Sequence, residues 1–456
     1  MLRKRIKTLC KLLLANILIF LVVGIIIEIG GQTYAYFHPA YKVIPFAPHP
    51  VLGWRFIPNT EHIITGNHWY AREFSAEVNI NSHGFRDFER IFKKDKNTIR
   101  IALLGDSMIS ARQVDFEKTA GQLLEKKLND KFRPKTGKKY EVLNFGVDGS
   151  GVDQMLLNWN HFAEKFDPDF LFLYLFEKNY LRTVSSIWCQ TGFFGIDNVQ
   201  HGDQKCLGIR PSIILRRKPI SRLELIEYRA QNALNDKVRS LDFWYVDPNT
   251  LDKINELIEF NKHQELLQHI KLLPFREVPP RDYERFIKEQ NKYLEKYMNG
   301  KRMVKVGNLV LVSLLNKVNY SIEKIFKTKP LEDDWRKNSR YTTGNINDSL
   351  SWNATNLVNL KTLQVLGDKI LNSGSEFIIM DSFQFHNESI PPTQFASNQL
   401  KSFSKFSGYS YIPLYEELNA SLKQGVSPTW VYDMHLNEIG NEIFAKSMFG
   451  FLESKL

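Results

Sequence analysis

Ser107 lies in the stretch IRIALLGDSMIS (residues 99–110), where an apolar run ends at Gly105 and continues into Asp106 and Ser107. A serine at such a turn has two interpretations. It can be a nucleophile, which requires a general base, an orienting carboxylate and donors for an oxyanion. It can also be the polar start of a helix, because Ser and Asp side chains accept hydrogen bonds from the first free N–H groups.

The segment VYDMHLNEIG (residues 431–440) contains the acid–base groups that such a nucleophile needs. Asp433 and His435 are two residues apart, so on an extended segment their side chains point the same way. The carboxylate would then orient the imidazole that accepts the serine proton. The alternative is that Asp433 caps the last helix and His435 is a surface residue.

Two further stretches could provide oxyanion donors. NFGVDGSG (residues 144–151) contains Gly146, Gly149 and Gly151, and a glycine-rich turn lets a backbone N–H approach a ligand closely. Asn179 follows the apolar run FLFLYLF, and its amide could donate to an oxyanion. The alternatives are that the glycines serve only the turn and that Asn179 merely ends a strand.

The elements that must position these residues alternate along the chain. Such alternation predicts an α/β fold, a three-layer α/β/α doubly wound and mostly parallel sheet, in which the carboxyl ends of the strands collect the functional groups. Strand-like runs occur at NTIRIALLG, YEVLNFG, FLFLYLF, EFIIMD and SYIPL. Helical patterns occur at 117–130, 152–166, 352–371, 394–406 and 436–452.

The alternation stops between about residues 185 and 349. This segment contains helical stretches, such as LDKINELIEFNKHQELLQHIKLL and RDYERFIKEQNKYLEKYM, and residues 211–340 carry a surplus of about +8 charges. Its apolar run VGNLVLVSLLNKV either lies at a membrane interface or, as we prefer, packs the insertion onto the core. We therefore divide the chain into a basic stub with a transmembrane anchor (1–30), a linker and N-terminal extension (31–96), two core parts (97–184 and 350–456) and a helical basic insertion (185–349).

The N-terminus has the features of a membrane anchor. Five cations and no acid precede Leu12 in residues 1–11, and the following apolar run, extended to Ile29, spans about 27 Å as a helix. This charge distribution predicts a single-pass membrane protein with its N-terminus in the cytoplasm and its body outside. A cleaved signal peptide is the alternative, although its apolar region is usually shorter.

The composition narrows the class of protein further. The net charge of +11 falls to about +6 without the N-terminal stub, and no nucleic-acid-binding motif is present, so we do not expect nucleic acid as a partner. Cys189 and Cys206 would lie in an oxidising compartment, where they form a disulfide or remain two free thiols. No metal or organic cofactor is implied.

The four stretches, in this order, resemble the blocks of the SGNH hydrolases, also called GDSL esterases, over about residues 97–182 and 350–455. The resemblance implies a nucleophile at Ser107, an oxyanion hole at Gly149 and Asn179, and an acid–base pair at Asp433 and His435. HPVLGWRFIPN and INSHGFRD also look like segments of membrane-anchored bacterial members.

Two stretches depart from the usual family pattern. The third block has Glu177-Lys178-Asn179-Tyr180 where Gly-x-Asn-Asp is usual. The last block has Asp-x-His where Asp-x-x-His is best known, which is similar to the envelope polysaccharide acetylation proteins of the superfamily.

The resemblance implies a serine ester hydrolase or O-acyltransferase that acts on acyl esters, acetyl above all, of an envelope polysaccharide or another glycan. A membrane-bound acyl donor protein is a candidate partner. The alternatives are a lipid-directed esterase and a non-catalytic glycan-binding or assembly protein with the same fold.

Overall fold

The computed structural model describes most of the chain outside the insertion. The described residues are 2–37, 46–49, 52–68, 71–183, 187–189, 206–209, 212–215, 253, 256–257, 262–272, 275–278, 349–385, 391–431 and 433–456.

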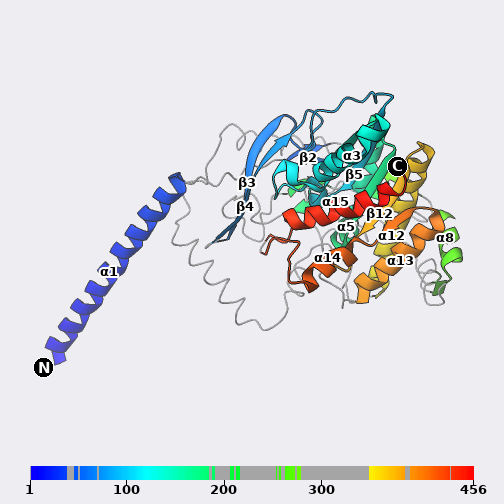
Figure 1. The fold of residues 1–456 in the computed structure, drawn as a ribbon. Helices are drawn as coiled ribbons and strands as arrows, with labels where there is room; N and C mark the ends of the chain where they lie inside the picture. Colours follow the sequence, from blue (N-terminus) through cyan, green and yellow to red (C-terminus); the bar gives the residue numbers. More distant parts are fainter. Residues whose placement is uncertain are drawn as a thin grey trace.

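The centre of the molecule is a five-stranded parallel sheet with the order β13-β12-β7-β5-β6 (Figure 1). Numbered along the chain, the strands have the order 2-1-3-4-5 of flavodoxin-like folds. The direction in which successive strands are added to the sheet reverses between β5 and β7. All five strands coincide with predicted strands, and the α/β fold class is confirmed. The strands are β5 (Thr98–Gly105), β6 (Lys139–Gly146), β7 (Phe170–Leu175), β12 (Glu376–Asp381) and β13 (Ser410–Ile412).

Helices cover both faces of the sheet, as apolar side chains pointing in both directions require. One buried cluster joins the sheet to α4, α5, α12 and α13, and the other joins it to α3, α14 and α15. The helices of the first face are α4 (Val152–His161), α5 (Glu177–Thr183), α12 (Ser349–Asn372) and α13 (Pro391–Ser407), and those of the second are α3 (Ala120–Thr136), α14 (Leu414–Lys423) and α15 (Glu438–Glu453). Short 3-10 turns at η1 (Phe116–Lys118) and η2 (Ala163–Phe166) precede α3 and follow α4.

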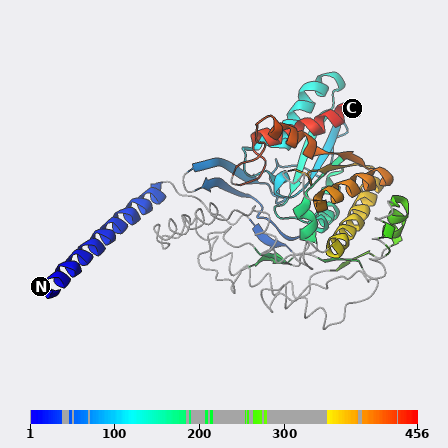
Figure 2. The same ribbon diagram turned by 90° about the horizontal axis from the view of Figure 1, so that it is seen from below.

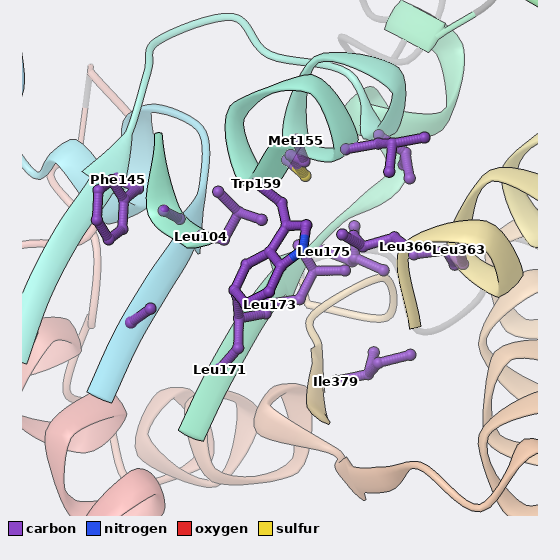
Figure 3. Packing of buried hydrophobic residues seen from close by; sticks show 14 of the residues in the cluster. Leu104, Phe145, Met155, Trp159, Leu171, Leu173, Leu175, Leu363, Leu366 and Ile379 are labelled. Carbon is purple, nitrogen blue, oxygen red and sulfur yellow. The ribbon is translucent and has the colours of Figure 1, made fainter. Parts of the chain in front are cut away.

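The first cluster is built around an aromatic side chain of α4. Figure 3 shows Trp159 lying over Leu171 and Leu173 of β7, with Leu363 and Leu366 of α12 on the neighbouring side. Each of these side chains is at most 2% exposed, and burial of such a side chain stabilises the fold by about 1.5–3 kcal/mol.

The helical patterns predicted for the core correspond to α3, α4 with η2, α12, α13 and α15, whereas α5 and α14 were not predicted. The run SYIPL was predicted as strand throughout, but β13 ends at Ile412 and α14 begins at Leu414. Pro413 separates them because it has no N–H to donate to a strand ladder.

The N-terminal helix α1 (Leu2–Phe37) projects from the body in both ribbon views (Figures 1 and 2). Its segment Lys11–Gly31 is long and apolar enough to cross a membrane, a property shared by membrane anchors and signal sequences.

Part of the expected N-terminal linker belongs to the body. β1 (Phe46–His49) pairs with β2 (Gly53–Phe56), and Phe46 and Phe56 lie in the first apolar cluster. A second antiparallel hairpin follows, formed by β3 (Thr60–His68) and β4 (Ala71–Ile80).

The described part of the insertion contains both helix and strand. α8 (His263–Leu272) lies within a predicted helical stretch, whereas two antiparallel pairs were not expected. These pairs are β8 (Ile187–Cys189) with β9 (Cys206–Ile209) and β10 (Ser212–Leu215) with β11 (Phe275–Val278). The stretches RDYERFIKEQNKYLEKYM and VGNLVLVSLLNKV lie outside the described residues.

The backbone register gives the predicted disulfide a geometric basis. Cys189 and Cys206 are partners in the β8–β9 ladder, next to a register shift between Trp188 and Cys189. Directly opposite Cα atoms in antiparallel strands are about 4.5–5.5 Å apart, within the range that a disulfide spans. We therefore expect both cysteines of the non-reduced protein to resist alkylation in mass analysis and to become alkylated after reduction. Free thiols in the non-reduced protein would contradict the pairing.

Candidate active site

The serine turn connects β5 to a single helical turn, α2 (Ser107–Ser110). The Asp106 carboxylate accepts a hydrogen bond from the Met108 N–H at 3.1 Å, and thus caps this turn. Close packing fixes the position of α2 against the end of β6, because a Cβ on Gly146 would lie 2.3 Å from the Ser110 nitrogen. The capping interpretation therefore applies to Asp106 and leaves the hydroxyl of Ser107 available for another partner.

That partner is His435, which lies 328 residues away in the sequence. Ser107 Oγ is 2.8 Å from His435 Nε2, and His435 Nδ1 is 2.5 Å from Asp433 Oδ1. With a hydrogen on Nδ1 directed to the carboxylate, Nε2 is free to accept the serine proton. Asp433 is not the cap of the last helix, because Asn437 accepts from the Gly440 N–H in that position.

The backbone around this pair is a turn rather than the extended segment that the sequence suggested. Met434 adopts a left-handed conformation with φ of 69°, which is uncommon for a residue other than glycine. The loop closes through hydrogen bonds from the Trp430 N–H to the His435 carbonyl and from the Met434 N–H to the Trp430 carbonyl. On an extended strand the two side chains would run parallel, whereas this turn lets them converge.

The surroundings of His435 favour its protonated form. Burial alone would lower its pKa, but the hydrogen bond and charge of Asp433, with the charges of Asp148 and Asp106, raise the pKa above its ordinary value of 6.5. A histidine with this pKa takes up a proton more readily than an isolated imidazole, as a general base must.

We expect the pKa of His435, followed by NMR titration of its ring, to lie above 6.5 in the native protein. In Asp433→Asn it should be lower, because the amide carries no charge to stabilise the imidazolium. An unchanged titration in the variant would show that the carboxylate does not act on the ring.

Asn179 lies in α5, close behind the serine turn. Its amide nitrogen is 2.9 Å from the Ser150 carbonyl and 3.2 Å from Asp106 Oδ2, and its amide oxygen accepts from the Phe176 N–H. Arg182 of the same helix forms an ion pair with Asp106. Donation from Asn179 to a substrate oxygen would require one of these two N–H contacts to be exchanged, so its oxyanion role stays a prediction.

Gly149 lies in the buried turn after β6, which brings the glycine-rich stretch next to the serine turn. Its φ of 75° is in the left-handed region, where glycine has no steric penalty. The neighbouring Asp148 accepts from Ser110 Oγ at 2.5 Å, which joins this turn to α2. The role of the Gly149 N–H as an oxyanion donor remains a prediction.

A buried charge cluster that the sequence did not reveal holds these turns together. Arg112 pairs with Asp148, with its Nε at 3.0 Å. Burial would raise the pKa of Asp148, but the Arg112 charge and its hydrogen bond hold it below the usual value. Arg86 donates to the carbonyls of Glu77, Ala111 and Val114, which fixes the chain after the serine. Removal of one partner of such a buried pair costs about 3–5 kcal/mol.

The sequence does contain Arg86 within INSHGFRD, but no spacing rule indicated that its guanidinium would bind backbone carbonyls. Among the described residues, no group of three or more His, Cys, Asp or Glu side chains could hold a metal ion.

Comparison with known proteins finds similar solved structures only. No protein-family model matches the chain, and no curated protein sequence does. The acetyl xylan esterase AlAXEase is similar at 12% identity over 78% of this chain and 100% of its own, with a TM-score of 0.34. Axe2, an acetylxylan esterase from Geobacillus stearothermophilus, is similar at 11% identity over 78% and 95%, with a TM-score of 0.33. LAE5, an alpha/beta hydrolase enzyme from the metagenome of Lake Arreo, Spain, is similar at 10% identity over 79% and 97%, with a TM-score of 0.34. Because the sequence identities and TM-scores are this low, we assign no residue role and no activity from the similarity.

Proposed function

We propose that this protein is a serine ester hydrolase or O-acyltransferase of the SGNH type. The observation that carries the proposal is the continuous hydrogen-bonded chain from Ser107 Oγ through His435 to Asp433. A serine, a base and an orienting carboxylate in mutual contact are the minimum for acyl transfer through a covalent intermediate.

The reaction proceeds in two halves. Ser107 Oγ attacks the ester carbonyl carbon while His435 Nε2 accepts the hydroxyl proton. The tetrahedral intermediate collapses, the bond to the leaving oxygen breaks, and that oxygen takes the proton from His435. Water or a sugar hydroxyl then loses a proton to His435 and attacks the carbonyl carbon of the acyl-serine. The bond to Ser107 Oγ breaks, Oγ takes the proton from His435, and the acyl group leaves on the oxygen of the water or sugar.

The negative oxygen of the intermediate requires hydrogen-bond donors. The backbone N–H groups of Ser107 and Gly149 and the amide of Asn179 are the proposed donors. Rigid donors of this kind are effective because they need no reorganisation when the charge develops. In the structure the Asn179 amide donates to Ser150 and Asp106, so Asn179 would have to exchange one of these contacts to donate to the oxyanion.

The location that we propose is the outer face of the bacterial inner membrane, with α1 as an uncleaved anchor. The candidate span Lys11–Gly31 lies on a single helix, with the basic residues of the stub at its start. The substrate proposed from the family resemblance is an O-acyl group, acetyl above all, on an envelope polysaccharide or other glycan. In the transferase version, a membrane-bound acyl donor protein supplies the acyl group.

A reporter that is active only outside the cytoplasm should be active when fused to the C-terminus. The reason is that basic residues before a span remain in the cytoplasm. The matched control is a reporter that works only in the cytoplasm, which should be inactive at the same position. The opposite pattern would overturn the proposed location.

Turnover of a chromogenic acetyl ester by the purified full-length protein tests the proposed activity. Hydrolysis that falls as the acyl chain is lengthened would support an acetyl esterase, whereas preference for long chains would point to a lipid-directed enzyme. A protein that binds acetylated glycan but neither turns over the ester nor reacts with a serine-directed probe would contradict the catalytic proposal.

A further inference from the structure

The hairpin formed by β3 and β4 contains an irregularity at Glu73. Gly66 pairs with Phe74 and Asn67 pairs with Arg72, so Glu73 is an extra residue on β4, as in a β-bulge. A bulge bends the strand and directs a side chain away from the position that regular alternation would give it. Bulges of this kind are frequent beside active sites.

The bulge meets the loop that bears the acid–base pair. Glu73 Oε2 accepts a hydrogen bond from the backbone N–H of Asp433 at 3.1 Å. The next residue, Phe74, packs its ring on Trp430 of the same loop, with ring centroids 5.3 Å apart. Two adjacent residues of β4 therefore contact two positions of the loop, across a separation of 360 residues between Glu73 and Asp433.

The position of Phe74 depends on its cross-strand partner. A Cβ on Gly66 would lie 2.3 Å from the Phe74 ring, so the ring occupies the space that any other residue would fill. From this position the Phe74 ring contacts the ring of Trp430.

The loop needs such support because its own backbone is strained. Met434 is in the left-handed region at φ of 69°, and this turn brings the Asp433 carboxylate within 2.5 Å of His435. The described hydrogen bonds inside the loop join Trp430 to Met434 and His435. The bond to Glu73 holds the Asp433 backbone from outside the loop.

We propose that Glu73 is a positioning residue for the acid–base pair: it fixes the backbone of Asp433, and through it the orientation of His435. The inference rests on the proposed function for its effect on turnover, but its effect on the loop does not depend on catalysis. This contact also gives the N-terminal extension a role in the site, although the extension precedes Ser107 in the sequence.

The test compares Glu73→Ala with Glu73→Gln in the full-length protein. Alanine removes the acceptor, and we expect kcat for a chromogenic acetyl ester to fall roughly tenfold to a hundredfold with KM little changed, because small displacements of reacting groups are costly. Glutamine keeps an oxygen acceptor at the same position, and we expect it to restore kcat to within about threefold of the native value, since it loses only the charge of the acceptor.

Glu77→Ala is the matched control, because Glu77 is an exposed carboxylate on the same strand. It should leave kcat unchanged. If kcat of Glu73→Ala equals kcat of Glu77→Ala, the positioning role is wrong. It is also wrong if kcat of Glu73→Gln is as low as kcat of Glu73→Ala.

Amide hydrogen exchange of the peptide that covers residues 428–437 provides a readout without turnover. Exchange should be faster in Glu73→Ala than in the native protein and in Glu73→Gln. If the native protein has no esterase activity but the three proteins differ in exchange in this way, the proposed function is wrong. The contact between Glu73 and the loop is then still supported. An active native protein whose loop exchanges equally in all variants would refute the inference alone.

Discussion

Replacement of Ser107 by alanine is expected to abolish covalent labelling by an organophosphonate probe and to lower ester turnover roughly 10⁴-fold or more. The native hydroxyl is 2.8 Å from His435 Nε2, so the imidazole can remove its proton as it attacks phosphorus or carbon. An isolated serine hydroxyl lacks such a base and barely reacts. Mass analysis of the labelled protein should place the adduct on Ser107.

Ser447→Ala is the control, because the Ser447 hydroxyl donates to the Ile443 carbonyl of its own helix, α15. It makes no described contact with His435, so labelling at Ser107 should persist. If the probe reacts equally with the native protein and with Ser107→Ala, the catalytic proposal fails. The serine turn would then be only the capped start of α2.

His435→Ala is expected to lower both labelling and turnover by a similar factor of roughly 10⁴, because a nucleophile and its base act as a unit. His161→Ala, an exposed histidine at the end of α4, is the control and should retain native activity. Activity of His435→Ala close to that of the native protein would exclude His435 as the base.

The pH dependence of the native rate provides a second check on His435. The base acts only when it is neutral, so the rate should rise as the pH passes through its pKa. Because Asp433 raises that pKa above 6.5, the midpoint of the rise should lie above the ordinary value for histidine. In Asp433→Asn the rise should occur at lower pH and reach a lower plateau, since the ring is then less well oriented.

Much of this protein could be predicted from local patterns in the chain. The apolar runs in β5, β6 and β7 indicate buried parallel strands, because a strand covered on both faces needs apolar side chains on both sides. The five strands and most of the helices follow from such periodicities, whereas the order of the strands within the sheet comes from the structure. Ser107, Asp433 and His435 were identified as a set because their residue types and positions relative to these elements suit one reaction.

Other features depend on contacts between residues that are distant in the sequence, and no local pattern encodes them. The left-handed conformation of Met434 is an example, since methionine has no preference for it and the surrounding contacts must impose it. The partners of Asn179, the Arg112–Asp148 pair and the bond from Glu73 to Asp433 are of the same kind. Residue types and periodicity therefore identify the groups that can react, but the packing of separate segments sets their distances and orientations. The free energy of a buried hydrogen bond or ion pair depends on the position of both partners, and those positions exist only once the chain has folded.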